Sequence, residues 1–455
     1  MEQLEKLEIT YQTIELPEEM DFQAIGRYLN DDVDKFLRVA ALNDGSRTIM
    51  AVLPFTALLD IKALGNQTGS EFHALTAAQT KDLFKSAVHP SRPPVPELVK
   101  CRTIVDASVM EMSQVIIESG HPKTLIQLDQ QGIEKLFGDC ESHDFAAGRD
   151  RLYAGRDAET SSPDLDVSFT PIRLRQRIDD TFDLPAMPEI AQDIMKLRVD
   201  PSADATKLAQ IVCRDPSLAA QVISWASSPY YGYQGKVDSV ETAIARVLGF
   251  ELVMNLALGI SIGKSLKVPM DGPLGVREFW KQSIYCASLS EKLCRAIPIK
   301  QRPERGLIYL SGLLHNFGHL LLGHIFPPQF GLVNETILAN PHISVEDIEF
   351  YILGVTHEEI GAWLMQNWHM PDELIVAVHR HHQEEFWSKH AVYSNIVLVA
   401  NRLLKRINIG DSLETEIPQT TLELLSLDYD TAESALRDIE LESETLDIMA
   451  KQLVA

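Results

Sequence analysis

Short apolar runs alternate with helix-like segments over the first third of the chain. The runs at 47–54, 100–108 and 123–128 are rich in β-branched residues, as buried strands are. The segments between them have the character of helices, so strands and helices take turns along this part of the sequence. Such alternation predicts an α/β domain over residues 1–142.

The strand pattern ends near residue 170, and amphipathic helices follow. The segment 202–215, for example, places Leu208, Ile211 and Val212 on one helical face. Pro-containing turn signals separate this helix from several others. We therefore predict an all-α domain over residues 173–410, and a linker over the polar stretch 143–172.

The last 45 residues, 411–455, continue the helical pattern with an unusual charge. They hold twelve acidic residues against Arg437 and Lys451. Six apolar residues can share one helix face: Ala432, Leu436, Ile439, Leu446, Met449 and Leu453. This pattern predicts an acidic helical extension packed on the all-α domain with a solvated acidic face. The alternative is an acidic docking surface for a partner.

Composition and charge narrow the class of protein. The 455 residues are 45% hydrophobic and 23% charged, which is ordinary for two to four globular domains. A formal charge of -24 argues against general DNA binding and against adhesion to an anionic membrane. Five widely spaced cysteines without a CxxC motif are typical of reduced thiols. With a polar N-terminus and no membrane-spanning run, we expect a cytoplasmic protein.

Histidine is concentrated in one part of the chain. Ten of the 14 histidines lie between His315 and His390. Imidazole clusters can hold Zn or Fe, and His315 and His319 share a helix face because they are four residues apart. Asn316 stands where an HExxH protease has its glutamate, so a zincin is not expected.

The residues around these histidines point to a family. The helical part resembles the HDOD (HD-related output) domain of bacterial signalling proteins, within the HD superfamily. The similarity runs from about 175 to 410 and rests on segments at 184–188, 213–219, 243–249, 279–283, 312–318, 356–362, 364–371 and 381–382. It implies an HD-like helical fold and a role in signal transduction or regulation.

The resemblance also implies a departure from catalysis. HD phosphohydrolases use a His…His-Asp…Asp pattern, and the matching positions here are Gln282, His315, Asn316 and Asn401. Amides ligate metals poorly, so we expect a catalytically degenerate domain, without a cofactor, that binds a protein partner or signalling nucleotide rather than turning over a substrate. The alternative is a residual Fe, Mn or Zn site and a metal-dependent phosphodiesterase. Its ligands would be His315, His357, His381 and His382.

A run of aromatic residues forms a second candidate site in the all-α domain. It contains Trp225, Tyr230, Tyr231 and Tyr233. Aromatic side chains anchor interfaces, so this run could line a ligand or partner groove. The alternative is a helix end followed by a turn, with the aromatic rings in the core.

The N-terminal domain resembles the YbaK/prolyl-tRNA editing deacylase family. The similarity rests on segments 33–39, 47–54 and 103–108. It implies a mixed sheet with helices, and it places Lys35 at the family lysine that helps hold an aminoacyl ester. An aminoacyl-tRNA or aminoacyl group is then a candidate partner, and trans-editing through Lys35 an alternative function. Lys35 is otherwise an ordinary surface lysine.

Overall fold

The structure is a computed structural model that describes residues 2–20, 22–84, 92–153 and 185–454. It divides into two compact units. The first contains the described residues up to 153 together with 332–343. The second contains the remaining described residues.

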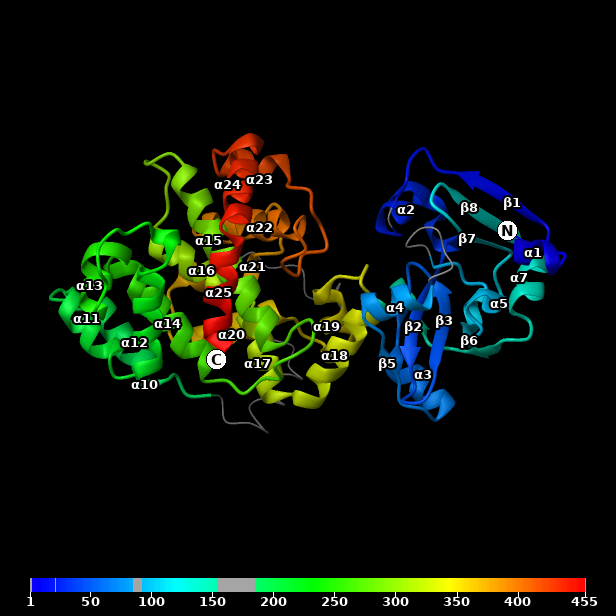
Figure 1. The fold of residues 1–455 in the computed structure, drawn as a ribbon, viewed down its shortest axis with the longest axis horizontal. Helices are drawn as coiled ribbons and strands as arrows, with labels where there is room; N and C mark the ends of the chain where they lie inside the picture. The colour runs from blue at the N-terminus through cyan, green and yellow to red at the C-terminus, as the bar shows by residue number, and fades with distance from the viewer. Residues whose placement is uncertain (1, 21, 85–91, 154–184, 455) are drawn as a thin grey trace. The chain divides into compact units, whose positions relative to one another are not determined.

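The first unit is built on mixed β-structure (Figure 1). Its five-stranded sheet has the order β5 (His73–Ala74), β2 (Leu37–Asn43), β3 (Thr48–Pro54), β6 (Arg102–Asp106), β9 (Glu141–His143). The β2–β3 pair is antiparallel, whereas β3–β6 and β6–β9 are parallel. An antiparallel sheet has the order β1 (Tyr11–Glu15), β8 (Thr124–Asp129), β7 (Gln114–His121), and β4 (Leu58–Leu59) pairs with β10 (Ala146–Ala147).

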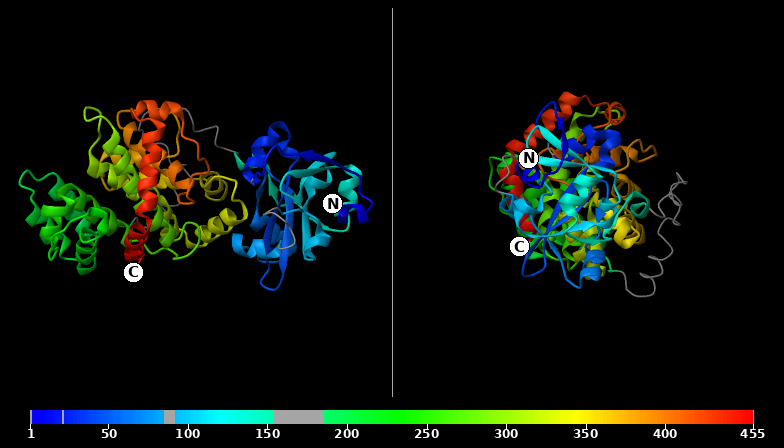
Figure 2. Two further views of the ribbon diagram at one scale, coloured as in Figure 1. Left: turned by 45° about the horizontal axis from the view of Figure 1, so that its top comes forward. Right: turned by 90° about the vertical axis from the view of Figure 1, so that its right-hand side faces the viewer.

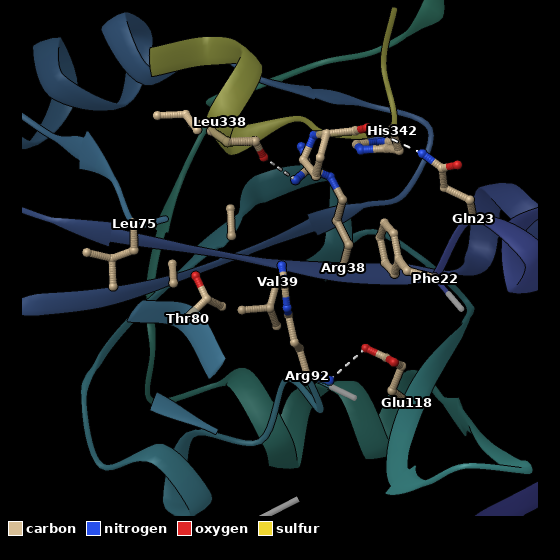
Figure 3. A pocket seen from close by; sticks show the side chains of 14 residues that line it. Phe22, Gln23, Arg38, Val39, Leu75, Thr80, Arg92, Glu118, Leu338 and His342 are labelled. Atoms are coloured by element: carbon tan, nitrogen blue, oxygen red, sulfur yellow. Dashed lines mark hydrogen bonds between the residues drawn. The ribbon is translucent and has the colours of Figure 1, made fainter. Parts of the chain in front are cut away.

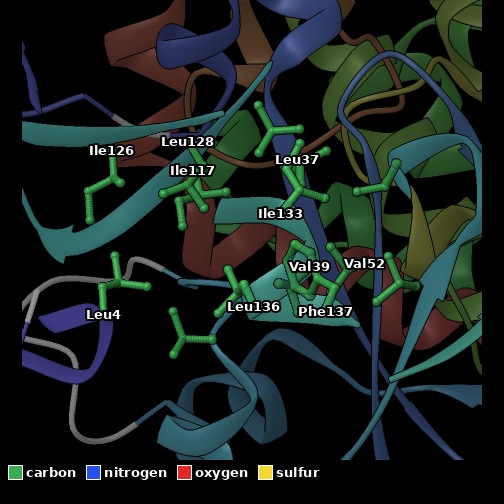
Figure 4. Close-up of a cluster of buried hydrophobic side chains, with 14 of the residues drawn as sticks. Leu4, Leu37, Val39, Val52, Ile117, Ile126, Leu128, Ile133, Leu136 and Phe137 are labelled. Carbon is green, nitrogen blue, oxygen red and sulfur yellow. The ribbon is translucent and has the colours of Figure 1, made fainter. Parts of the chain in front are cut away.

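Short helices accompany these strands. They are α1 (Glu2–Lys6), α2 (Phe22–Leu29), η1 (Asn30–Lys35), α3 (Ile61–Thr68), α4 (Ala77–Leu83), α5 (Pro96–Val99), α6 (Ala107–Met110), α7 (Gln130–Phe137) and α8 (Arg149–Leu152). Strand β2 is buried on both faces: Leu37 and Val39 join one apolar cluster and Ala40 and Leu42 another. Figure 4 shows the first cluster, where α7 contributes Ile133 beside β2 and β8. Double-sided burial explains why this strand is apolar without alternation.

The mixed α/β fold predicted for the N-terminal domain is confirmed, and the predicted runs form β3, β6 and β8. In the range 143–172, which the sequence predicts to be a linker, residues up to 153 contain β10 and α8 with Phe145 and Leu152 buried. The buried carboxylate of Asp106 accepts hydrogen bonds from the backbone of Phe145 and Ala146, at 2.8 and 2.7 Å. The rest of that range lies outside the described residues.

The described residues of the second unit form helices joined by loops. Its helices are α10 (Glu189–Arg198), α11 (Ala205–Val212), α12 (Pro216–Ala226), η3 (Pro229–Tyr231), α13 (Val240–Ala243), η4 (Ile244–Leu248), α14 (Phe250–Lys264), α15 (Val276–Ala296), α16 (Arg305–Leu314), α17 (Phe317–Ile325), α18 (Pro327–Ala339, of which the part from 332 belongs to the first unit), α19 (Val345–Leu353), α20 (His357–Asn367), α21 (Asp372–Arg380), α22 (Ala391–Lys405), α23 (Gln419–Leu424), α24 (Tyr429–Leu441) and α25 (Ser443–Val454). The all-α description therefore holds for this unit only.

Helix α15 is the centre of the second unit, and it packs against α16, α22, α24 and α25. Figure 2 shows α25, the red helix that ends at the C-terminus. The apolar face predicted for the tail is buried in α24 and α25, and the Tyr285 hydroxyl donates to Asp447 at 2.9 Å. Among the described residues, none of the helices has the length and apolar character required to cross a membrane.

Replacing Leu446 by alanine should destabilise the second unit, because Leu446 is fully buried where α25 packs on α15. We expect a loss of about 2–5 kcal/mol in the free energy of unfolding, measured by urea denaturation followed by circular dichroism. Ile448→Ala in the same helix is the matched control, since Ile448 is 51% exposed. It should change stability by less than about 0.5 kcal/mol. Equal losses in the two variants would contradict the packing of α25.

Candidate functional site

Four metal-ligating side chains converge in the interior of the second unit. They are His357, His381, His382 and Asp411, and one ligand atom from each lies within 4.8 Å of the others. The His357 and His381 Nε2 atoms are 3.4 Å apart, and Asp411 Oδ2 lies 3.3 Å from His382 Nε2 and 3.8 Å from His357 Nε2. We call this group the four-ligand cluster.

Helix ends place these side chains. Thr356 and Glu359 form a capping box, so α20 begins at His357. Helix α21 ends at Arg380, which puts the two other histidines in the turn that follows. Asp411 comes after Gly410, which has φ +97°. A Cβ at that position would collide with the side-chain oxygen of Asn401, so only glycine allows the chain to pass this closely.

Each histidine of the four-ligand cluster uses its other ring nitrogen for a hydrogen bond. His357 Nδ1 lies 2.8 Å from Glu349 Oε2, and His382 Nδ1 lies 3.0 Å from Glu346 Oε1. His381 Nδ1 lies 2.9 Å from the Val378 carbonyl oxygen. Because an acceptor holds each Nδ1, each Nε2 is the ring nitrogen that is turned toward the cluster. Proteins orient histidine ligands for a metal in this way.

The carboxylates set the protonation of this cluster. Burial lowers the pKa of His357, but Glu349 outweighs burial and raises it to about 9. Burial likewise opposes charge on His382, yet Glu346 and Asp411 raise its pKa well above the usual value. At His381, burial and the neighbouring histidines outweigh the effect of Asp411 and lower the pKa well below its usual value. A metal ion would take the place of the protons on His357 and His382.

A second group of ligand atoms shares His357 with the first. It consists of His319, Glu349 and His357, with His319 Nε2 3.0 Å from Glu349 Oε1. Gly318 allows α17 to approach α20 closely, because a Cβ there would overlap the His357 carbonyl oxygen. Burial opposes ionisation of Glu349, but His357 and His319 lower its pKa to about 2.

Three of the four histidines predicted as metal ligands therefore come together, and His315 lies beside them. Its Nδ1 is 2.8 Å from the Gly312 carbonyl oxygen, and its ring centroid is 5.1 Å from that of His381. Its buried Nε2 has no hydrogen-bond partner among the described residues. Burial lowers the pKa of His315 to about 4, so the ring is a neutral potential donor.

The amides that stand at the HD positions make side-chain hydrogen bonds within this region. Asn316 Nδ2 donates to Gln282 Oε1 at 3.1 Å, so these two amides pair. Asn401 Nδ2 donates to Asp411 Oδ1 at 2.6 Å, which leaves Oδ2 directed at the histidines. The amides thus orient their neighbours instead of supplying metal ligands.

Sequence reasoning missed the carboxylates of this site. The ligands that the sequence predicts for a residual metal site are four histidines and no carboxylate, whereas Glu346, Glu349 and Asp411 are all buried there. Asp411 was assigned to a solvated acidic tail, but it turns inward because Asn401 and His382 hold it. Glu346 and Glu349 are three apart and share a face of α19, which was the available sequence signal.

One residue of the predicted aromatic groove, Trp225, is buried in the core of the second unit. Trp225 is 1% exposed, and its Nε1 donates to Gln452 Oε1 at 3.0 Å. Tyr230 and Tyr231 meet edge to face with ring centroids 4.9 Å apart. Tyr230, Tyr231 and Tyr233 are only partly exposed. Trp225 therefore faces the interior of the unit and is not available to a ligand in this conformation.

Lys35 lies at the surface of the first unit. Its Nζ pairs with Asp32 at 2.7 Å, and its side chain is 43% exposed. A cavity of about 210 Å³ lies elsewhere in this unit, and the basic side chains among its lining residues are Arg38, Arg92 and His342. The structure thus does not bring Lys35 to the cavity.

The four-ligand cluster fits a divalent transition metal. Three imidazoles and one carboxylate match the donor types and number of a tetrahedral Zn site, and imidazole also suits Fe. The orphaned Nε2 of His315 supplies a further donor nearby. A bound metal would act here as a Lewis acid or as a structural crosslink, and the outer carboxylates would hold its histidine ligands in place.

Comparisons with known proteins agree with this architecture. The family model for the HDOD domain matches residues 184–384, and the model for the aminoacyl-tRNA editing domain matches residues 17–136. The solved structure of a candidate signal transduction protein from Marinobacter aquaeolei VT8 is 33% identical with a TM-score of 0.81. That similarity covers 100% of this chain and 99% of the other.

Two more distant proteins each match a little over half of this chain. An HDOD domain protein of unknown function from Geobacter sulfurreducens shares the fold, with a TM-score of 0.51 and 21% identity over 61% of this chain and 96% of the other. An uncharacterized protein of Treponema pallidum (strain Nichols) is 23% identical over 258 residues, or 56% of this chain. The match covers 48% of that curated relative, so the chain spans about half of its length.

Both resemblances drawn from the sequence are confirmed by the family models. The protein from Marinobacter is similar to this chain over 99% of its own length at 33% identity. The chain therefore belongs to the HDOD-domain proteins and carries an aminoacyl-tRNA editing domain ahead of its HDOD domain.

Proposed function

We propose that this protein is a regulatory protein whose HDOD domain holds one divalent transition-metal ion and acts by binding a partner or signalling nucleotide. The observation that carries the proposal is the four-ligand cluster, in which three Nε2 atoms and one carboxylate oxygen converge in the interior. Buried ionisable groups are costly unless they are compensated, and a cation would compensate three carboxylates at once. The ion would be Zn, Fe or Mn.

Binding is favoured over turnover by the number of protein ligands. Structural metal sites are closed by four protein ligands, whereas hydrolytic sites keep one position open for water. Four ligands from this chain would close a tetrahedral site. The metal-dependent phosphohydrolase is the second candidate, because Glu346, Glu349 and Asp411 supply the negative charge that the amides at Asn316 and Asn401 do not.

The metal site predicts a defined stoichiometry. Protein purified without an affinity tag or chelator should contain about one Zn, Fe or Mn per chain by inductively coupled plasma mass spectrometry. His381→Ala should lower metal content at least about tenfold, because it removes a ligand with no charge partner of its own. His390→Ala is the matched control, since His390 pairs with Glu373 outside the cluster, 3.5 Å away. Wild-type protein that is free of metal would refute the site.

The regulatory role predicts a ligand. Isothermal titration of the metal-loaded chain with cyclic dinucleotides and other signalling nucleotides should reveal binding of one of them at micromolar affinity or tighter. The same titrations with His381→Ala protein separate binding that needs the metal from binding elsewhere. Silence across the whole panel would remove the nucleotide ligand and leave a protein partner.

We propose a binding role for the N-terminal domain as well, with an aminoacyl group as the candidate ligand. Lys35 points to solvent beside Asp32, so it is poorly placed to act on a substrate in the cavity. Lys35→Ala should therefore leave the hydrolysis of mischarged tRNA by the full chain unchanged from the wild-type level, measured with radiolabelled aminoacyl-tRNA. Hydrolysis by wild type that disappears in Lys35→Ala would instead establish trans-editing.

A further inference from the structure

The cavity of the first unit is closed on one side by a segment from far along the sequence. The cavity is lined by Arg38 and Val39 of β2 and, from the distant segment, by Leu338, Ala339, Pro341 and His342 (Figure 3). Residues 332–343 belong to the first unit by their contacts, although 331 and 344 belong to the second. We call residues 335–342 the plug.

Arg38 is the main contact of the plug. Its side chain is buried, with 2% of the residue exposed. Nη1 donates to the Ala339 carbonyl oxygen at 2.9 Å, and Nη2 donates to Asn340 Oδ1 and, at 3.2 Å, to the Ala57 carbonyl oxygen. A buried guanidinium needs such acceptors, because it has lost its hydration. The plug thus satisfies both terminal nitrogens of Arg38.

Asn340 joins the plug to the sheet. It is fully buried, and its Oδ1 accepts from the Leu59 backbone N–H at 2.7 Å. Its Nδ2 donates to the Leu59 carbonyl oxygen at 3.2 Å and to the Thr336 carbonyl oxygen at 2.8 Å. The side-chain amide therefore pairs with Leu59 as a neighbouring strand would. The Asn340 side chain thus makes three hydrogen bonds to residues outside the plug.

Further contacts hold the two ends of the plug. Glu335 accepts from the backbone N–H of Ala74 at 2.8 Å. At the other end, His342 Nε2 lies 2.6 Å from the Phe55 carbonyl oxygen, and the two rings are 4.8 Å apart. Gln23 donates to the Pro341 carbonyl oxygen at 3.3 Å. Figure 3 shows His342 and Gln23 at the same side of the cavity as the Arg38 guanidinium.

The plug presents two oxygens to one guanidinium, and a carboxylate does the same. The Ala339 carbonyl and the Asn340 amide oxygen face Nη1 and Nη2 separately. Carboxylates pair with arginine through two parallel hydrogen bonds of this kind, and the charge makes those bonds stronger. We propose that the plug is an internal substitute for a small carboxylate ligand, and that such a ligand competes with the plug for Arg38.

The cavity suits that exchange. Its volume of about 210 Å³ accommodates a small organic molecule. Arg92 also lines it, and burial lowers the pKa of that arginine while Glu118 opposes the shift. If the plug leaves, the buried Arg38 loses its hydrogen bonds to Ala339 and Asn340. An anion with two oxygens would replace both of these hydrogen bonds. This inference does not depend on the proposed metal site.

Hydrogen–deuterium exchange on the wild-type full chain tests the competition without any mutation. The probes are N-acetyl-L-alanine, which carries a carboxylate, and N-acetyl-L-alaninamide, which has the same shape without the charge. We expect N-acetyl-L-alanine to increase exchange in peptides covering 332–343 and at Leu59, and the amide to leave it unchanged. Equal responses to the two probes, or none, would overturn the proposal.

A matched pair of variants tests the role of Asn340. Asn340→Ala should speed exchange over 332–343 at least tenfold and tighten N-acetyl-L-alanine binding at least tenfold in isothermal titration. Asn367→Ala is the control, because that amide donates to Trp363 within α20, at 2.9 Å. It should match wild type in both measurements. Equal affinity in wild type and Asn340→Ala would show that the plug and the carboxylate do not compete.

Discussion

The second unit depends on the compensation of buried charge around His357. Its imidazole has Glu349 at Nδ1 and the other three members of the four-ligand cluster on its Nε2 side. Glu349, His381 and Asp411 are buried, and His382 is partly buried. An isolated ion in such a place would be expelled or neutralised, so the carboxylates and histidines stabilise one another as a group. The charged groups meet because α20 begins at His357, α21 ends just before His381, and the chain turns at Gly410.

The same physical requirement appears in the first unit in another form. Arg38 is buried, and the oxygens that surround it come partly from a segment three hundred residues further along the chain. A buried arginine without acceptors would be strongly unfavourable, so the contact selects one conformation of residues 335–342. Both sites contain buried ionisable side chains whose hydrogen-bond partners are supplied by the tertiary structure.

The residues at the HD positions contribute to the four-ligand cluster through a hydrogen bond. Asn316 and Asn401 cannot supply the charge of aspartates, but Asn401 orients Asp411 through a hydrogen bond. Asp411 then presents its other oxygen to His382. Asp411 thus places a carboxylate beside the histidines, although it is not one of the four HD positions. This carboxylate is the reason that we propose a metal site where the sequence alone predicts none.

Patterns along the sequence were sufficient for the two fold classes, both family resemblances and three histidines of the cluster. These features depend on local periodicity and on the order of motifs, which a single sequence contains. The participation of Asp411, Glu346 and Glu349, the surface position of Lys35, and the docking of Asn340 on Arg38 were decided only by the tertiary structure. Each of them depends on which distant side chain shares a buried volume, and burial, not residue type, determines whether a charged group is solvated or paired.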